Sequence, residues 1–153
     1  MRWLEHLVPP PLVALLIGLA MWGAEHFAAP WAAPRGLRIG VAAALAIAGL
    51  GFGAAGLLAF RRAGANMDPH RIDKGEALVT QGVYRYTRNP MYLGVALVLL
   101  GYAVYLIRPV DFIGPLAFLG YITRFQILPE ERAMTRKFGA RYEAYARATR
   151  RWL

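Results

Sequence analysis

Long apolar stretches alternate with short polar ones along the whole sequence. Four stretches are nearly free of charged residues, at 12–24, 39–60, 91–107 and 112–128, the last with Arg124 inside it. A helix needs about 20 apolar residues to cross the hydrocarbon core of a membrane. Strands are not expected, because no stretch alternates with a period of two. The pattern predicts an all-α integral membrane protein with four transmembrane helices, which we place at residues 12–28, 38–60, 90–107 and 112–128.

The C-terminal part of the chain has a different pattern. Met134, Phe138, Tyr142 and Tyr145 follow one another at the spacing of a helical face, and basic residues occupy the other face. This spacing predicts one amphipathic cytoplasmic helix over 129–150, after a cytoplasmic loop at 61–89. The third and fourth stretches are joined by residues 108–111 alone, which predicts a tight antiparallel helical hairpin. Together these elements form a single domain.

Charge is distributed unevenly over the 153 residues. The chain has 58% hydrophobic residues, 18 Lys and Arg against 9 Asp and Glu, and a net charge of +9. Most of the basic residues lie in segments 61–90 and 124–153, which four spans would bring to the same side of the membrane. By the positive-inside rule that side is the cytoplasm. We therefore expect cytoplasmic N- and C-termini in a bacterial-type inner or plasma membrane, and contact with membrane lipids rather than nucleic acid.

Two further patterns restrict the chemistry. The sequence has no Cys, and its three His share no ligand spacing, so neither thiol chemistry nor a metal site is expected. Residues 51–56 match G-x-G-x-x-G, but they lie inside the second apolar stretch. Because Gly49 and Gly53 also form G-x-x-x-G, we interpret these glycines as sites of close helix packing. The glycine-rich stretch would also permit a homodimer.

The segment from residue 76 to residue 94 combines polar and aromatic residues at the start of the third stretch. Asn89 followed by Pro90 predicts a helix N-terminus, because Asn is a good N-cap and Pro is favoured at the first helical position. Tyr84, Tyr86 and Tyr92 lie near this point in the sequence. A capped span with aromatic anchors explains some of these residues, but it does not explain a polar loop and a tyrosine cluster beside Glu130 and Glu131.

These motifs resemble those of a known family of enzymes. T-R-N-P-M-Y-L-G at 87–94 is similar to the R-[HN]-P-x-Y-x-G motif of integral-membrane methyltransferases, namely the isoprenylcysteine carboxyl methyltransferases and the related phospholipid N-methyltransferases. L-V-T-Q-G-V-Y at 78–84 resembles their L-V-T-x-G-x-Y segment. The glutamate pair at 130–131, with F-G-x-x-Y-x-x-Y at 138–145, resembles their C-terminal motif. The resemblance implies an enzyme that uses S-adenosylmethionine, releases S-adenosylhomocysteine and binds its cofactor on the cytoplasmic side.

The resemblance also implies roles for individual residues. The family's cofactor contacts correspond to Glu76, Ala77, Leu78, Val79, Tyr84, Asn89, Pro90, Met91, Tyr92 and Glu130. Glu130 could pair with a positive group of the cofactor, and Arg124 could bind a carboxylate or phosphate of the acceptor, so these two are the expected catalytic residues. The chain departs from the family in having Asn89 where many members have His. Gln126 occupies the place of the substrate-binding Arg of the isoprenylcysteine enzymes, with Arg124 displaced by two residues.

Three functions are compatible with these motifs. The first is methyl transfer to an amphiphilic, lipid-like or prenylated acceptor, of the isoprenylcysteine carboxyl O-methyltransferase type. The second is phospholipid N-methylation on an ethanolamine headgroup. The third is a non-catalytic membrane scaffold that has kept the fold, which the two departures at Asn89 and Gln126 would favour.

Overall fold

The protein is described here by a computed structural model, which covers residues 8–24, 27–63 and 78–153. All regular elements within these ranges are helical, as the sequence predicts. In chain order they are α1 (Pro10–Gly23), α2 (Arg35–Arg62), the 3₁₀ turn η3 (Gly82–Arg85), α3 (Pro90–Leu106), the 3₁₀ turn η4 (Pro109–Phe112), α4 (Ile113–Ile122), the π-helical segment η5 (Thr123–Ile127), α5 (Leu128–Phe138) and α6 (Ala140–Ala148).

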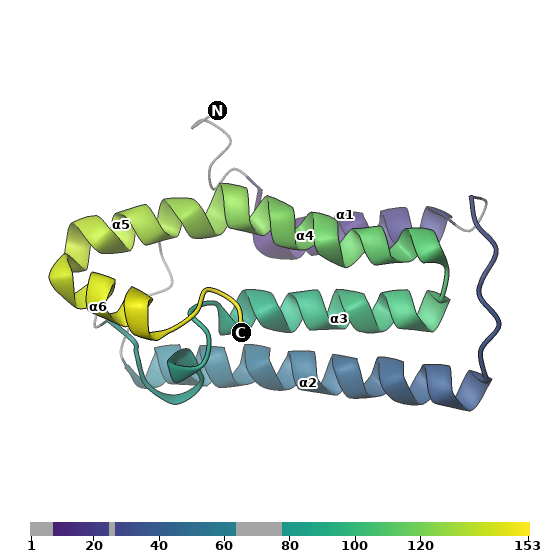
Figure 1. Ribbon diagram of the computed structural model, residues 1–153, viewed down its shortest axis with the longest axis horizontal. Helices are drawn as coiled ribbons and strands as arrows, with labels where there is room; N and C mark the ends of the chain where they lie inside the picture. Colours follow the sequence, from purple (N-terminus) through teal and green to yellow (C-terminus); the bar gives the residue numbers. More distant parts are fainter. Residues whose placement is uncertain (1–7, 25–26, 64–77) are drawn as a thin grey trace.

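Helix α3 lies at the centre of the bundle, with α2 on one side and α1 and α4 on the other (Figure 1). Helices α4, η5 and α5 follow one another without a break, so α5 extends past the start of α3. Helix α6 then turns back toward α3, and the C-terminal residues lie beside the start of α3 (Figure 1). The buried apolar core is made by α1, α3, α4 and η5, through Val13, Met21, Ala96, Leu99, Ala103, Phe118, Ile122 and Ile127.

Glycines allow α2 and α3 to pack closely. A Cβ atom at Gly94 would meet the Gly49 carbonyl oxygen and would lie 2.9 Å from the Gly53 amide nitrogen. A Cβ atom at Gly101 would lie 2.8 Å from the Ala42 carbonyl oxygen. Small residues are what such a close backbone approach requires. The prediction of helix packing is confirmed for Gly49, whose partner is α3 of the same chain. A Cβ atom at Gly53 would meet nothing among the described residues within 4 Å, so the close approach there depends on Gly94.

Among the described helices, α2 is the one that is long and apolar enough to cross a membrane. It has 28 residues and a mean hydropathy of 2.1, and at 1.5 Å per residue it is about 42 Å long. Helices α1 and α3 are apolar but shorter. Large apolar side chains of α2 such as Leu37, Ile47 and Leu50 are exposed, as expected for a helix surface that faces lipid.

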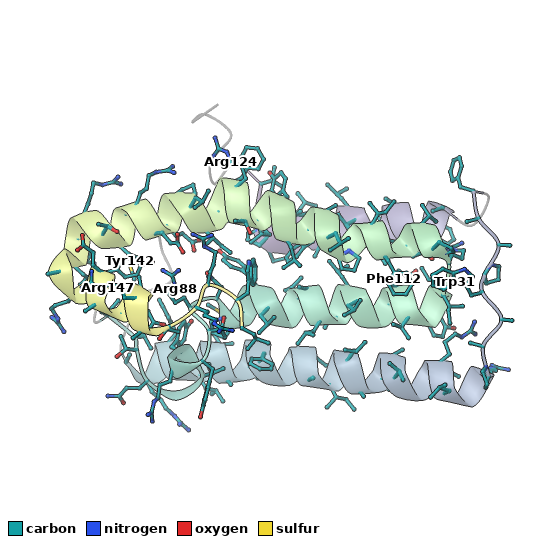
Figure 2. All side chains as sticks on the ribbon, in the orientation of Figure 1. Trp31, Arg88, Phe112, Arg124, Tyr142 and Arg147 are labelled. Atoms are coloured by element: carbon teal, nitrogen blue, oxygen red, sulfur yellow. The ribbon has the colours of Figure 1, made fainter. Side chains whose placement is uncertain are left out.

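A buried ion pair closes the hairpin between α3 and α4. Ile107 ends α3 in the left-handed conformation, with φ of 55°. The Arg108 guanidinium then donates to both carboxylate oxygens of Asp111, at 2.8 and 3.2 Å, and to the Met21 carbonyl of α1 at 2.6 Å. Nearby, Trp31 donates its amide to the Ile107 carbonyl at 2.9 Å, and its ring lies 6.0 Å from that of Phe112 (Figure 2). The predicted tight hairpin is confirmed, and the loop between α1 and α2 is attached to it through Trp31.

The single amphipathic helix predicted over 129–150 is wrong in one respect. The chain bends at Gly139, where φ is 50° and ψ is −130°, and this divides the region into α5 and α6. A residue with a side chain rarely adopts this conformation, whereas glycine does so at little cost. The bend turns α6 back toward the start of α3, which a straight helix could not reach.

Candidate active site

The Asn89 side chain at the start of α3 contacts Arg151 and does not cap the helix. The helix begins at Pro90, as predicted, but the Asn89 side chain makes no capping hydrogen bond. Its Nδ2 atom instead donates to the Arg151 carbonyl at 2.9 Å, while its backbone amide donates to Thr87 Oγ1 at 3.2 Å. Thr87 is fully buried, and its hydroxyl donates in turn to the same Arg151 carbonyl at 3.2 Å. The proposed side-chain cap is therefore replaced by a contact with the C-terminal segment.

The first turns of α3 and α5 meet through Tyr92 and Glu130. The Tyr92 hydroxyl donates to Glu130 Oε1 at 2.7 Å, although the two residues are 38 positions apart. Both side chains are half-buried. A hydroxyl hydrogen bond to a carboxylate is short and strong because the acceptor is charged. This contact joins two of the sequence motifs in space.

The neighbouring glutamate has cationic partners. The Arg151 guanidinium donates to both oxygens of Glu131, at 2.9 and 2.8 Å, in the paired geometry typical of Arg and carboxylate. Arg88 Nη2 lies 3.2 Å from Glu131 Oε1. Arg88 also donates from Nη1 to the Tyr142 hydroxyl at 3.4 Å, and Figure 2 shows both side chains on the side of α5 that faces α6. The first turn of α5 is thus attached to the segment before α3 and to the C-terminal segment.

Two further tyrosines complete this end of the bundle. The Tyr145 hydroxyl of α6 donates to the Tyr84 carbonyl of η3 at 2.7 Å. Burial, and secondly the charge of Glu130, raise the pKa of Tyr84 to about 12. Burial also raises the pKa of Tyr145, with a smaller contribution from Tyr84. Both phenols are therefore neutral at physiological pH, and Tyr145 can act as a hydrogen-bond donor.

The predicted cofactor residues are placed in different ways. Tyr84, Asn89, Tyr92 and Glu130 lie together at the start of α3. Pro90 and Met91 face α2, because a Cβ atom at Gly56 would lie 3.0 Å from a side-chain atom of each. Leu78 and Val79 are half-buried in the segment before η3, which has no regular secondary structure. The remaining two, Glu76 and Ala77, lie outside the described residues.

The two residues near the place of the family's substrate-binding Arg point in different directions. Gln126 is buried, and its Nε2 atom donates to the Val8 carbonyl before α1 at 3.0 Å. Arg124 is exposed, with its guanidinium 5.3 Å from the Phe125 ring centre. Figure 2 shows Arg124 on the outer side of the continuous α4–α5 helix, away from Arg88 and Tyr142.

Several residues of the site were not assigned a role from the sequence. These are Thr87, Arg88, Glu131, Tyr142, Tyr145 and Arg151. All but Arg151 lie within the motifs that carry the resemblance, so the motifs could have indicated them. Arg151 lies outside every motif, and its contacts are visible only in the fold.

The chain is similar to known proteins over part of its length. Residues 37–141 match the family described as phospholipid methyltransferase. A stretch of 63 residues is 38% identical to an uncharacterized protein of Haemophilus influenzae, and it covers 41% of this chain and 100% of that protein. No solved structure is significantly similar to the chain. The matched residues 37–141 include Tyr92 and both glutamates but end before Arg151.

Proposed function

The chain belongs to the phospholipid methyltransferase family, and from this membership we propose that it transfers a methyl group from S-adenosylmethionine to a lipid at the membrane. Membership supports a membrane methyltransferase that acts on lipids. The observation that carries the proposal to this site is the 2.7 Å hydrogen bond between Tyr92 and Glu130. It brings two motifs of the family together at the end of the bundle where the α3 N-terminus and the buried tyrosines lie.

The residues at this site fit the groups of S-adenosylmethionine. The first backbone hydrogen bond into α3 runs from Leu93 to Asn89, so the amides of Met91 and Tyr92 have no acceptor within the helix. Such amides, at the positive end of a helix, suit a carboxylate. Arg88 Nε is buried without a hydrogen-bond partner among the described residues, so a second donor is available to an anion. Glu130 would attract the cofactor's ammonium group, and the tyrosine rings would pack on adenine.

For this reaction the protein mainly has to bind the two reactants and align them. S-adenosylmethionine, when bound, supplies a methyl group that is already activated for attack. The chain's residues then have to hold the two reactants in line and keep water away. In this proposal Glu130, held by Tyr92, orients the donor. A carboxylate acceptor would need no general base, whereas an ethanolamine headgroup would first have to lose a proton.

A phospholipid is the acceptor that the observations favour. The family match names phospholipids, and Gln126, in the place of the Arg that binds an isoprenylcysteine, is engaged with the Val8 carbonyl. Arg124, exposed on the outer face of η5, is proposed to bind the phosphate of the headgroup as it approaches from the lipid side. The isoprenylcysteine type remains the second candidate, because the motifs at 78–94 resemble those of both groups of enzymes.

We also propose that α1, α2, α3 and the continuous α4–η5 helix all span the membrane, with the site and both termini on the cytoplasmic side. Basic residues support this orientation. Arg61 and Arg62, in the last turn of α2, lie at the same end of the bundle as α6 and the start of α3 (Figure 1). Concentration of Arg and Lys at one end is typical of the cytoplasmic face.

Two measurements test the function. Titration calorimetry of the purified protein in detergent should detect binding of S-adenosylhomocysteine, and Glu130→Ala and Tyr92→Ala should weaken it at least tenfold. Exposed Tyr86→Phe is the control and should bind as the wild type does. Absence of binding by well-folded protein would refute the enzyme assignment. With a radiolabelled donor, label in phosphatidylethanolamine would support the phospholipid acceptor, and label only in a prenylcysteine analogue would support the second candidate.

A further inference from the structure

The segment after α6 runs along the start of α3. Thr149 leaves the helix in an extended conformation and is buried. The Arg88 amide donates to the Arg150 carbonyl at 3.0 Å, and one residue further Thr87 and Asn89 both donate to the Arg151 carbonyl. Figure 1 shows the C-terminal end of the chain beside the first turn of α3. Three successive residues before α3 are therefore hydrogen-bonded to residues 150–151.

Side chains attach the same segment to α5 and to the core. The Arg151 guanidinium makes the two-point contact with Glu131, and the Arg151 side chain is 36% exposed, against 18% for Glu131. Trp152 packs against the apolar core. Arg150, in contrast, is exposed, and its side chain donates a 3.4 Å hydrogen bond to the Leu153 carbonyl. Of the two adjacent arginines, Arg151 thus attaches the segment to α5, whereas the Arg150 side chain contacts the segment itself.

The contact with Arg151 also determines how the Asn89 side chain is turned. A carbonyl oxygen can only accept a hydrogen bond, so the amide atom that meets it must be Nδ2. The Oδ1 atom then lies on the other side of the carboxamide, where it can accept a hydrogen bond from a ligand. An Asn at this position would be free to turn either way if the Arg151 carbonyl were not there.

We propose that Arg151 is a positioning residue of the methyltransferase site. Its side chain holds Glu131, and with it the turn that carries Glu130. Its carbonyl turns Asn89 and Thr87 toward the arrangement in which the cofactor is bound. This inference rests on the proposed function. It assigns a role to a segment outside residues 37–141, the range that matches the family, so this segment supplies a part of the site that the family match does not include.

The mechanism predicts an effect on ground-state binding. Arg151 touches no reacting atom, and it aligns groups that hold the cofactor before and during the reaction alike. Loss of such uniform binding raises KM and leaves kcat nearly unchanged. Loss of a merely stabilising contact would instead lower the melting temperature and leave the affinity of the folded protein as it was.

The test compares three variants in detergent by calorimetry with S-adenosylhomocysteine and by methyl transfer to phosphatidylethanolamine. Arg151→Ala should weaken binding about tenfold, equivalent to about 1.4 kcal/mol, and raise KM for the donor by a similar factor. Arg151→Lys, which keeps the charge but loses the paired geometry, should weaken binding about threefold. Arg150→Ala removes the same charge one residue earlier and should bind within twofold of the wild type.

A double-mutant cycle separates positioning from general stabilisation. In a Glu131→Gln background, Arg151→Ala should weaken binding by clearly less than it does in the wild type, because the partner of its guanidinium is already altered. Equal affinities for Arg151→Ala and Arg150→Ala, at any melting temperature, would overturn the inference and leave the proposed function standing. Absence of binding by the wild type would overturn the proposed function, and the inference with it.

Discussion

The buried ion pair between Arg108 and Asp111 gives the sharpest prediction for stability. The Asp111 side chain is 0% exposed and that of Arg108 is 7% exposed. Removal of one member of a buried pair leaves the other charge without compensation and costs about 3–5 kcal/mol. At about 2–4 °C for each kcal/mol in a chain of this size, Asp111→Ala should lower the melting temperature by about 6–20 °C.

Thermal unfolding in detergent, followed by intrinsic tryptophan fluorescence, measures the effect. Glu143→Ala removes an exposed carboxylate from α6 and is the matched control, expected to melt within about 2 °C of the wild type. Replacement of both partners, as Arg108→Met with Asp111→Leu, should recover more than half of the loss, because no charge then remains buried. If Asp111→Ala melted with the control, the pair would not be a buried charge pair in the protein, and our account of the hairpin would be refuted.

Three other outcomes test separate contacts. Gly94→Ala places a Cβ atom against the backbone of Gly49 and Gly53 and should cost about 1–3 kcal/mol in thermal unfolding, whereas Gly51→Ala, with open space around it, should cost nothing. Asn89→Asp puts a carboxylate, which cannot donate, against the Arg151 carbonyl and should weaken S-adenosylhomocysteine binding about tenfold. Asn89→His keeps a hydrogen-bond donor and should largely avoid this loss. Equal loss of affinity in both variants would contradict the assigned contact. The pKa of Tyr84 is raised to about 12 in the folded protein from about 10 in the unfolded chain, so its contribution to stability is fully present below pH 10 and is lost as the pH rises from 10 toward 12. The free energy of unfolding measured in denaturant should fall over this range, and a flat profile would contradict the burial of Tyr84.

Local patterns predicted the elements of the fold well. The apolar stretches became α1, α2, α3 and α4, and the Asn89–Pro90 pair marked the start of α3 within one residue. Gly49 was correctly assigned to helix packing. Each of these features depends on neighbours in sequence or on a regular spacing, which is why the sequence alone contains them.

The bend at Gly139 and the contacts between distant residues were not predicted. The spacing of Met134, Phe138, Tyr142 and Tyr145 continues through Gly139, so periodicity predicted one helix where the positive φ of Gly139 makes two. The partner of the Asn89 side chain is 62 residues away, at Arg151. A cap would use the Oδ1 atom of Asn89 as acceptor, whereas the contact with Arg151 uses Nδ2 as donor, and the position of the C-terminal segment orients the carboxamide for the second.

The bend at Gly139 and the division of roles between the two glutamates are parts of one arrangement. Successive residues on a helix project about 100° apart, so adjacent glutamates in the first turn of α5 cannot face the same partner. Glu130 meets Tyr92 of α3, while Glu131 meets Arg88 and Arg151. Arg151 is within reach of Glu131 only because Gly139 turns α6, and the segment after it, back along the start of α3. A helix continued past Gly139 would leave Glu131 without this partner and would leave the Asn89 side chain free to cap α3.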